Sequence, residues 1–307
     1  KKDFKKEFFY NLKVGFNKKN YLFQVGDHPK SNQIFNNKYP FFTHKSKFMS
    51  NHFKEFFIWL QKNYLKKNDN IIEIGSNDGT FSSYFSKKNY HVIGFEPSLN
   101  VANIARKKKL KVISKFFNYK NVSKFKKMKN NINLICAANV ICHIPDLKDL
   151  IKSLDFLLSK KGLFIFEEPY LGAMFKKVSY DQIYDAHVFI FSLHSIKTIF
   201  KDYGFDLINC LPQKTHGGSM RYVLARKNVY KVKGNVGKLL NKEKKAKLNK
   251  FSSCLKFKND CEKSKKKFRQ KILNLKKNGK TICGYAASAK STTALNYCKI
   301  NYNHIEY

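Results

Sequence analysis

A chain of 307 residues with 43% hydrophobic content is long enough to bury a large core in one or two domains. It has no apolar run of about 18 residues and no signal-peptide pattern in its lysine-rich start, so neither a membrane span nor secretion is indicated. The seven cysteines form no Cys-x-x-Cys pair, which favours a reducing, cytoplasmic location.

The formal net charge of +40 at pH 7 raises the question of a nucleic-acid or anionic-membrane partner. The lysines are scattered through every segment, however, and Asn, Phe and Ile, whose codons are also A/T-rich, are abundant. A scattered excess is typical of a solvated surface, so we favour compositional bias and expect no nucleic-acid partner.

Residues 46–66 predict the first helix, because apolar residues recur there at helical spacing. Residues 71–79 then read Ile-Ile-Glu-Ile-Gly-Ser-Asn-Asp-Gly, a buried strand that breaks into a glycine-bearing turn before another helix. Open α/β sheets bind nucleotide-like ligands at such turns, although an ordinary βα turn has the same pattern. The turn has neither the dinucleotide fingerprint nor a P-loop, and Asp78 suits a cationic, amine-bearing ligand such as S-adenosylmethionine (SAM).

A second strand at 91–95 ends at Glu96, a position where a carboxylate usually binds a ribose diol. Further strands and a helix alternate, at 111–113, 132–138, 147–158 (helix) and 162–169. This alternation predicts an α/β fold with a doubly wound sheet, whose ligands lie beyond the carboxyl ends of the strands. The turn and Glu96 together indicate a class I SAM-dependent methyltransferase.

The last third of the chain departs from a minimal methyltransferase. A helix is expected at 195–203, and a long lysine-rich helical stretch at 238–278. A new strand at 281–283 leads into a second small-residue turn, and there the chain stops. One strand and one turn do not make a domain, so we expect a fragment at the C-terminus. The lack of an initiating Met suggests the same at the N-terminus.

Six stretches in chain order resemble the sugar C-methyltransferases, which methylate a carbon of a nucleotide-linked keto-deoxysugar. They are Glu-Ile-Gly-Ser-Asn-Asp-Gly (73–79), Gly-Phe-Glu-Pro-Ser (94–98), Asn-Val-Ile-Cys-His-Ile (139–144), Tyr-Asp-Gln-Ile-Tyr-Asp-Ala-His (180–187), Thr-His-Gly-Gly-Ser-Met-Arg (215–221) and Gly-Tyr-Ala-Ala-Ser-Ala-Lys (284–290). The resemblance implies a class I methyltransferase fold, with the start of a second, Rossmann-like domain at the C-terminus.

The implied domains are a remnant of a zinc-type N-terminal domain at 1–45, the methyltransferase domain at 46–228, and a helical connector with a truncated substrate-binding domain at 229–307. Where the family has a Cys-x-x-Cys zinc knuckle, this chain has Asn17 and Asn20. Asparagine is a poor zinc ligand beside a thiolate, so we expect no metal.

The resemblance implies that the nucleotide sugar lies between the methyltransferase domain and the C-terminal domain. The residues expected to bind SAM are Glu73, Gly75, Ser76, Asn77, Asp78, Gly79, Glu96, Pro97, Ser98, Phe117 and Asn139. Those expected to bind the substrate are Tyr170, His216, Gly217, Gly218, Arg221, Tyr285 and Lys290. Arg221 would be available for a carboxylate or phosphate, and Lys290 for the nucleotide's phosphates. A solvated lysine is the plain alternative for Lys290.

Methyl transfer to carbon beside a ketone needs an enolate, and hence a general base and a donor for the developing oxyanion. By resemblance His187 is the base, with Tyr184 and His143 as hydrogen-bonding partners of the sugar or the enolate. His143 also fits a simple strand terminator ahead of Pro145. The family commonly has Glu directly before the base, whereas this chain has Ala186, so Asp185 is a candidate substitute.

Two other functions stay open from the sequence. A nucleic-acid methyltransferase would explain the charge, but the Asp/Asn-Pro-Pro-Tyr/Phe motif expected after the fourth strand is replaced by Asn139-Val-Ile-Cys. A catalytically impaired SAM-binding homologue would explain Ala186 and the missing cysteines.

Overall fold

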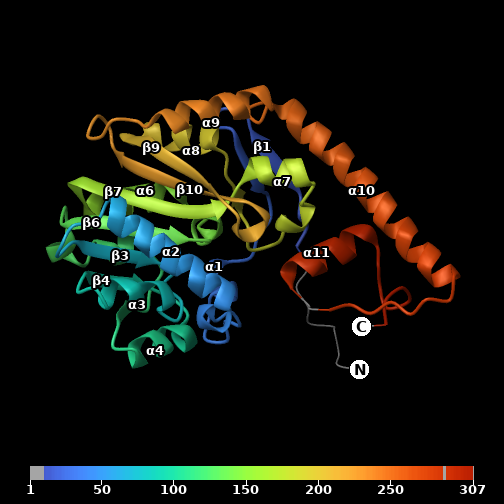
Figure 1. Cartoon of the computed structure of the whole chain (residues 1–307), viewed down its shortest axis with the longest axis horizontal. Coiled ribbons are helices and arrows are strands. Elements are labelled where there is room, and N and C mark those ends of the chain that lie inside the picture. The colour runs from blue at the N-terminus through green and yellow to red at the C-terminus, as the bar shows by residue number, and fades with distance from the viewer. Residues whose placement is uncertain (1–9, 286–287, 307) are drawn as a thin grey trace.

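The structure is a computed structural model that describes residues 10–285 and 288–306. Within them, a seven-stranded sheet has the order β5-β4-β3-β6-β7-β10-β9 (Figure 1). Its strands, in chain order, are β3 (Asn70–Ile74), β4 (His91–Phe95), β5 (Lys111–Ile113), β6 (Ile132–Ala138), β7 (Leu158–Pro169), β9 (Phe205–Gln213) and β10 (Ser219–Arg226). The strands from β5 to β7 are parallel, and β10 pairs antiparallel with β7 and β9. The predicted doubly wound sheet is confirmed.

Helices α2 (Lys47–Asn63) and α3 (Thr80–Ser86) cover one face of the sheet. Phe56 of α2 stacks on Phe81 of α3 at a ring-centroid distance of 5.0 Å, and both side chains are buried. The apolar stripe read from the sequence is therefore core packing.

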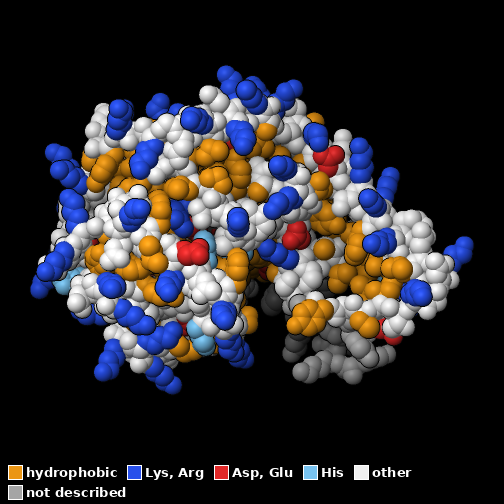
Figure 2. Space-filling model, in the orientation of Figure 1, with side chains coloured by type: hydrophobic (Ala, Val, Ile, Leu, Met, Phe, Trp, Pro, Cys, Tyr) orange, Lys and Arg blue, Asp and Glu red, His pale blue; other side chains and the backbone are white. Residues whose placement is uncertain are grey.

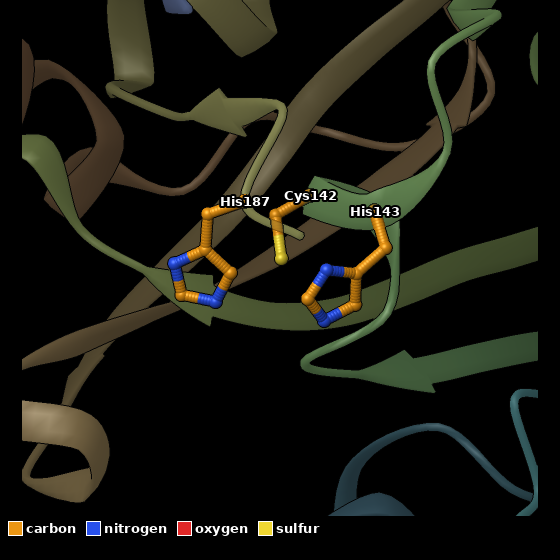
Figure 3. A group of neighbouring side chains, drawn as sticks. All are labelled: Cys142, His143 and His187. Carbon is orange, nitrogen blue, oxygen red and sulfur yellow. The ribbon is translucent and has the colours of Figure 1, made fainter. Parts of the chain in front are cut away.

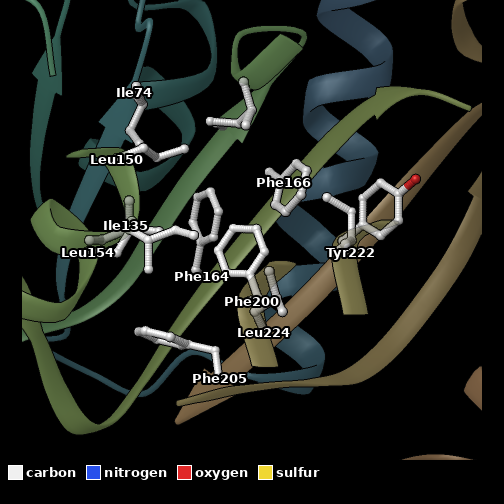
Figure 4. Packing of buried hydrophobic residues seen from close by; sticks show 14 of the residues in the cluster. Ile74, Ile135, Leu150, Leu154, Phe164, Phe166, Phe200, Phe205, Tyr222 and Leu224 are labelled. Atoms are coloured by element: carbon white, nitrogen blue, oxygen red, sulfur yellow. The ribbon is translucent and has the colours of Figure 1, made fainter. Parts of the chain in front are cut away.

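Helices α6 (Leu147–Leu157) and α8 (Leu193–Lys201) cover the opposite face. Figure 4 shows the larger core there, in which Phe166 of β7 stacks on Tyr222 of β10 at a centroid distance of 4.9 Å. The remaining helices of the methyltransferase region are α1 (Ser31–Ile34), α4 (Leu99–Lys107), α5 (Tyr119–Val122) and α7 (Leu171–Lys177). These two packed faces hold the carboxyl ends of β3 to β7 in a fixed row.

The N-terminal part of the described chain is a hairpin of β1 (Val14–Asn17) and β2 (Leu22–Val25). Strand β8 (Phe189–Ile190) pairs with β2 and completes a small separate sheet. Because β8 begins two residues after His187, this sheet supports the segment that carries the predicted base.

The C-terminal part differs from the sequence prediction. The stretch 238–278 is two helices, α9 (Gly234–Lys245) and α10 (Phe251–Lys277), separated where Lys247 has a φ of 55°. The strand expected at 281–283 is absent from the described residues, and α11 (Ala289–Cys298) packs back against α10 (Figure 1). Ala286 and Ala287, in the middle of the expected second turn, lie outside the described residues.

Lysine and arginine side chains are spread over the visible face of the molecule instead of gathering in one patch (Figure 2). Among the described helices, none has both the length and the hydrophobicity needed to cross a bilayer.

Candidate active site

The turn after β3 has a backbone conformation that requires glycine at position 75. Gly75 has a φ of 68°, and a Cβ added there would lie 2.5 Å from a methyl group of Val140. The main-chain N–H groups of Gly75 and Ser76 both donate to the carbonyl of Phe95, which ties the turn to the end of β4. Glycine is therefore needed here both for the positive φ and for the close packing of the turn against Val140.

A cavity of about 1080 Å³ opens above this turn, at the carboxyl ends of the parallel strands. Eight of the residues expected to bind SAM line it, namely Glu73, Gly75, Ser76, Asn77, Glu96, Pro97, Phe117 and Asn139. Glu96 accepts hydrogen bonds from the main-chain N–H groups of Asn77 (3.0 Å) and Ser98 (2.8 Å), which fix its carboxylate at the tip of β4.

Asp78, Gly79 and Ser98 do not line the cavity. Asp78 is fully buried and accepts hydrogen bonds from the main-chain N–H of His44 (2.8 Å), the His44 ring (2.7 Å) and Thr80. Burial alone would raise the pKa of Asp78, but these hydrogen bonds outweigh it and hold the pKa below its usual value. The Asp78 carboxylate, which we expected to face SAM, is instead hydrogen-bonded to His44 and Thr80 in the protein interior.

The partner of Asp78 belongs to a segment that the sequence analysis missed. Residues 39–45, which we call the strap, are hydrogen-bonded to the glycine-bearing turn, and Tyr39, Phe41 and Thr43 line the cavity. Asn77 accepts from the Thr43 N–H at 3.1 Å and donates to the Phe41 carbonyl at 3.1 Å. The turn thus holds the strap as one wall of the cavity.

His187 lies in the same cavity, with 4% of its surface exposed. Its Nδ1 is 2.8 Å from the main-chain carbonyl of Gln182, and its Nε2 is 2.6 Å from the hydroxyl of Tyr184. Because a carbonyl can only accept, Nδ1 carries the proton and the Nε2 lone pair accepts from Tyr184. Burial, reinforced by the neighbouring His143, holds the pKa of His187 well below its usual value. The ring is therefore neutral at pH 7 and has the protonation state that a base needs.

His143 lines the cavity beside His187, with ring centroids 5.2 Å apart. Its Nδ1 donates to the carbonyl of Ala186 at 2.5 Å, and burial lowers its pKa. Asp185 does not reach His187; its carboxylate accepts from the N–H of Ala186 at 3.0 Å. In this structure two main-chain carbonyls, those of Gln182 and Ala186, orient the two imidazoles.

Cys142 completes a group that the sequence analysis overlooked. Figure 3 shows its thiol between the rings of His143 and His187, and the ligand atoms of the three lie within 4.8 Å of one another. That spacing would allow a metal ion, but three of the four ring nitrogens already have hydrogen-bond partners, and burial raises the thiol pKa well above its usual value. The residues fit a hydrogen-bonded base better than a metal centre.

Asn17 and Asn20, at the expected zinc position, close the turn between β1 and β2. The Asn17 side chain accepts from the main-chain N–H groups of Lys19 (2.9 Å) and Asn20 (3.3 Å), and Asn20 accepts from the N–H of Leu22 at 3.2 Å. The hydrogen bonds of Asn17 and Asn20 therefore stabilise a tight turn at the place where a zinc knuckle was expected.

Of the residues expected to bind the substrate, His216 and Lys290 line the cavity. His216 has a left-handed φ of 50°, and its Nε2 is buried without a hydrogen-bond partner among the described residues. Burial and the charge of Lys290 lower the pKa of His216 to about 4. Gly217 and Gly218 form the turn behind this ring, where a Cβ on Gly218 would lie 2.6 Å from that of Ala173.

Arg221, Tyr170 and Tyr285 lie elsewhere. Arg221 is buried in an ion pair with Glu167 and stacks on Phe56, with its guanidinium carbon 3.7 Å from the ring centroid, so it is not free for a phosphate. The Tyr170 hydroxyl donates to Glu243 of α9 at 2.9 Å. Tyr285 is 99% exposed. Two of the three side chains have internal partners that the sequence did not indicate.

The sheet order and the cavity above the glycine-bearing turn define the class of protein, a class I SAM-dependent methyltransferase fold. Comparison with known families agrees: a methyltransferase domain profile matches residues 44–209, and a C-methyltransferase C-terminal domain profile matches residues 214–307. The chain belongs to this SAM-dependent methyltransferase family.

One related protein and one solved structure of similar fold can be compared with this chain. The C-methyltransferase NovU of Streptomyces niveus is 26% identical over 244 residues, which are 79% of this chain and 58% of NovU. The crystal structure of the PH0226 protein from Pyrococcus horikoshii OT3 superposes with a TM-score of 0.50 at 15% identity, over 61% of this chain and 94% of that one. The second likeness concerns the fold alone.

Proposed function

We propose that the protein transfers a methyl group from SAM to a carbon beside the ketone of a nucleotide-linked deoxysugar, with His187 as the base. The observation that carries this proposal is the placement of His187, Tyr184 and His143 in one cavity with the glycine-bearing turn. A SAM-dependent methyltransferase acting on a hydroxyl or amine needs no base able to deprotonate carbon. The name of the relative NovU, a C-methyltransferase, supports the same reaction.

The residues around the turn fit SAM. Gly75 lines the cavity with backbone alone, and Oδ1 of Asn139 is buried without a partner among the described residues, at the cavity wall. Glu96 presents a fixed carboxylate for the ribose diol. When bound, SAM supplies the electrophilic methyl group.

The chemistry assigned to this chain is proton removal and charge stabilisation. Nε2 of His187 takes the proton from the carbon next to the ketone, which requires the Tyr184 hydroxyl to leave that nitrogen. The released hydroxyl is then free to donate to the enolate oxygen, where negative charge develops. The α-carbon would then form a bond to the methyl group as the methyl–sulfur bond of SAM breaks and S-adenosylhomocysteine leaves. His187 would keep the proton until it passes to solvent.

The C-terminal segment supplies the wall for the nucleotide part of the substrate. Ser288, Ala289 and Lys290, at the start of α11, line the cavity. A helix start and a lysine together favour phosphate groups. The division into domains at residues 46–228 and 229–307 is part of this proposal.

The test is incubation of the protein with methyl-labelled SAM and a panel of 4-keto nucleotide sugars, followed by NMR of the product. We expect label on a ring carbon next to the ketone. Label on an oxygen or nitrogen, or SAM binding without transfer to any member of the panel, would overturn the proposal.

A further inference from the structure

Gln182 links two histidines that line the cavity, His187 and His216. It is buried, with 4% of its surface exposed, and ends the short 3-10 helix Tyr180–Gln182. Its main-chain carbonyl accepts from Nδ1 of His187 at 2.8 Å. Its side-chain amide donates to the main-chain carbonyl of His216 at 2.8 Å. One residue thus contacts both the base and the turn of a predicted substrate residue.

The turn that carries His216 depends on such external contacts. His216 is in the left-handed region at a φ of 50° and a ψ of 34°, a conformation that a residue with a Cβ adopts at a cost. Three donors hold the turn from outside: the Gln182 amide on the carbonyl of His216, the Lys177 ammonium on the carbonyl of Gly217 at 2.5 Å, and the main-chain N–H of Tyr170 on the carbonyl of Gly218 at 3.1 Å. Of the two side-chain donors, Gln182 is buried and Lys177 is exposed, so the Gln182 bond is the better protected from water.

The side chain that this turn positions is the His216 ring. The His216 ring lines the cavity, and its Nε2 is buried with no hydrogen-bond partner among the described residues. A buried polar atom without a partner is costly, and a ligand oxygen would remove that cost. The geometry therefore favours His216 as a contact to the bound molecule.

We propose that Gln182 is a positioning residue that fixes the His216 ring relative to the His187 base, and that His216 hydrogen-bonds an oxygen of the sugar. This deepens the proposed function and rests on it, because His216 would then set which sugar places its α-carbon at Nε2 of His187. Gln182 itself does not touch the substrate. It acts through the turn that it holds.

The variant Gln182→Met tests this, since methionine keeps the volume but cannot donate. We expect KM for the sugar nucleotide to rise about tenfold, the size of one buried hydrogen bond, while the Kd for SAM changes less than twofold. The control is Gln270→Met, which removes a side-chain amide donor to Asn274 on the exposed face of α10, away from the cavity. Its KM should equal that of the unaltered protein.

A double-mutant cycle separates positioning from simple stability. If Gln182 acts through His216, then kcat/KM of Gln182→Met with His216→Ala equals that of His216→Ala alone. Independent, multiplying losses would overturn the proposal, as would a Gln182→Met variant whose only change is a lower Tm.

Nitrogen NMR of labelled histidines gives a readout that does not need turnover. In Gln182→Met the His216 ring signals should shift, while His187 keeps its Nδ1–H tautomer because the Gln182 main chain remains. Unchanged His216 signals would refute the positioning role. If no keto sugar is methylated but His216 shifts as expected, the proposed substrate fails and the Gln182 contact stands.

Discussion

The hydroxyl of Tyr184 lies 2.6 Å from Nε2 of His187, with the two ring centroids 3.9 Å apart. The nitrogen assigned to take the substrate proton is therefore occupied before substrate binds. This contact gives the Nε2 lone pair of the buried His187 ring a hydrogen-bond donor. It also holds the Tyr184 hydroxyl close to the place where the enolate oxygen would form.

Tyr184→Phe should lower kcat at least tenfold, because the enolate loses its donor and Nε2 loses the hydrogen bond that orients it. SAM binding should stay within twofold, since the Tyr184 hydroxyl is bonded to the base. The measurement is steady-state kinetics together with calorimetry of SAM binding. Tyr203→Phe, at an exposed tyrosine on the surface, is the matched control. Full activity of Tyr184→Phe would exclude the proposed role.

Asp78→Ala should weaken SAM binding about tenfold by releasing the strap, because both hydrogen bonds from His44 of the strap would be lost, together with the one from Thr80. Amide hydrogen exchange of residues 39–45 should quicken in this variant. His44→Ala should give a smaller effect, since its main-chain N–H still reaches Asp78. Lost SAM binding with unchanged exchange in the strap would mean that Asp78 contacts SAM directly.

Stability should fall in acid because of the buried imidazoles. The folded-state pKa of His216 is about 4, whereas an unfolded histidine titrates near 6.5. Between these two pH values His216 is protonated in the unfolded chain but not in the folded one. The free energy of unfolding therefore decreases as pH falls through this window. His216→Gln should flatten the decline of Tm from pH 6.5 to 4, and His91→Gln, at an exposed histidine, should not. Equal slopes for both variants would contradict the burial of His216.

Glu243 should be a strong stabiliser, although it lies in the lysine-rich α9. Its carboxylate accepts from the Tyr170 hydroxyl (2.9 Å), from the main-chain N–H groups of Leu193 (2.7 Å) and His194 (3.0 Å), and from the His194 ring. Glu243→Ala leaves these buried donors unpaired and should cost about 2–4 kcal/mol in urea unfolding. Glu55→Ala, at an exposed position on α2, should change stability by less than about 0.5 kcal/mol. A loss below 1 kcal/mol for Glu243→Ala would show that water replaces it.

The local patterns of the sequence predicted the methyltransferase core well. Strands at 91–95, 111–113 and 132–138 occur at the predicted residues. Short runs rich in β-branched side chains and bounded by turn residues favour a buried strand over other structures. The glycine-bearing turn, Glu96 and His187 meet in one cavity because the carboxyl ends of parallel strands share an edge.

Partners far along the chain could not be predicted in the same way. Asp78 bonds a residue 34 positions earlier, Arg221 one 54 positions earlier, and Tyr170 one 73 positions later. Each of these polar side chains looked free for a ligand, since nothing near it in the sequence competes for it. The break between α9 and α10 was missed for another reason: a run of lysines carries helical propensity but no apolar period to mark where one helix ends.

The most direct test of the account is proton exchange at the substrate carbon. The protein is incubated in D₂O with S-adenosylhomocysteine, which has no methyl group to give, and a 4-keto nucleotide sugar that the labelled assay has shown to be methylated. We expect NMR to show deuterium entering next to the ketone, with the rate reduced about 10²- to 10⁴-fold in His187→Ala and unchanged in His194→Ala. Exchange that proceeds equally in His187→Ala would contradict the assignment of His187 as the base.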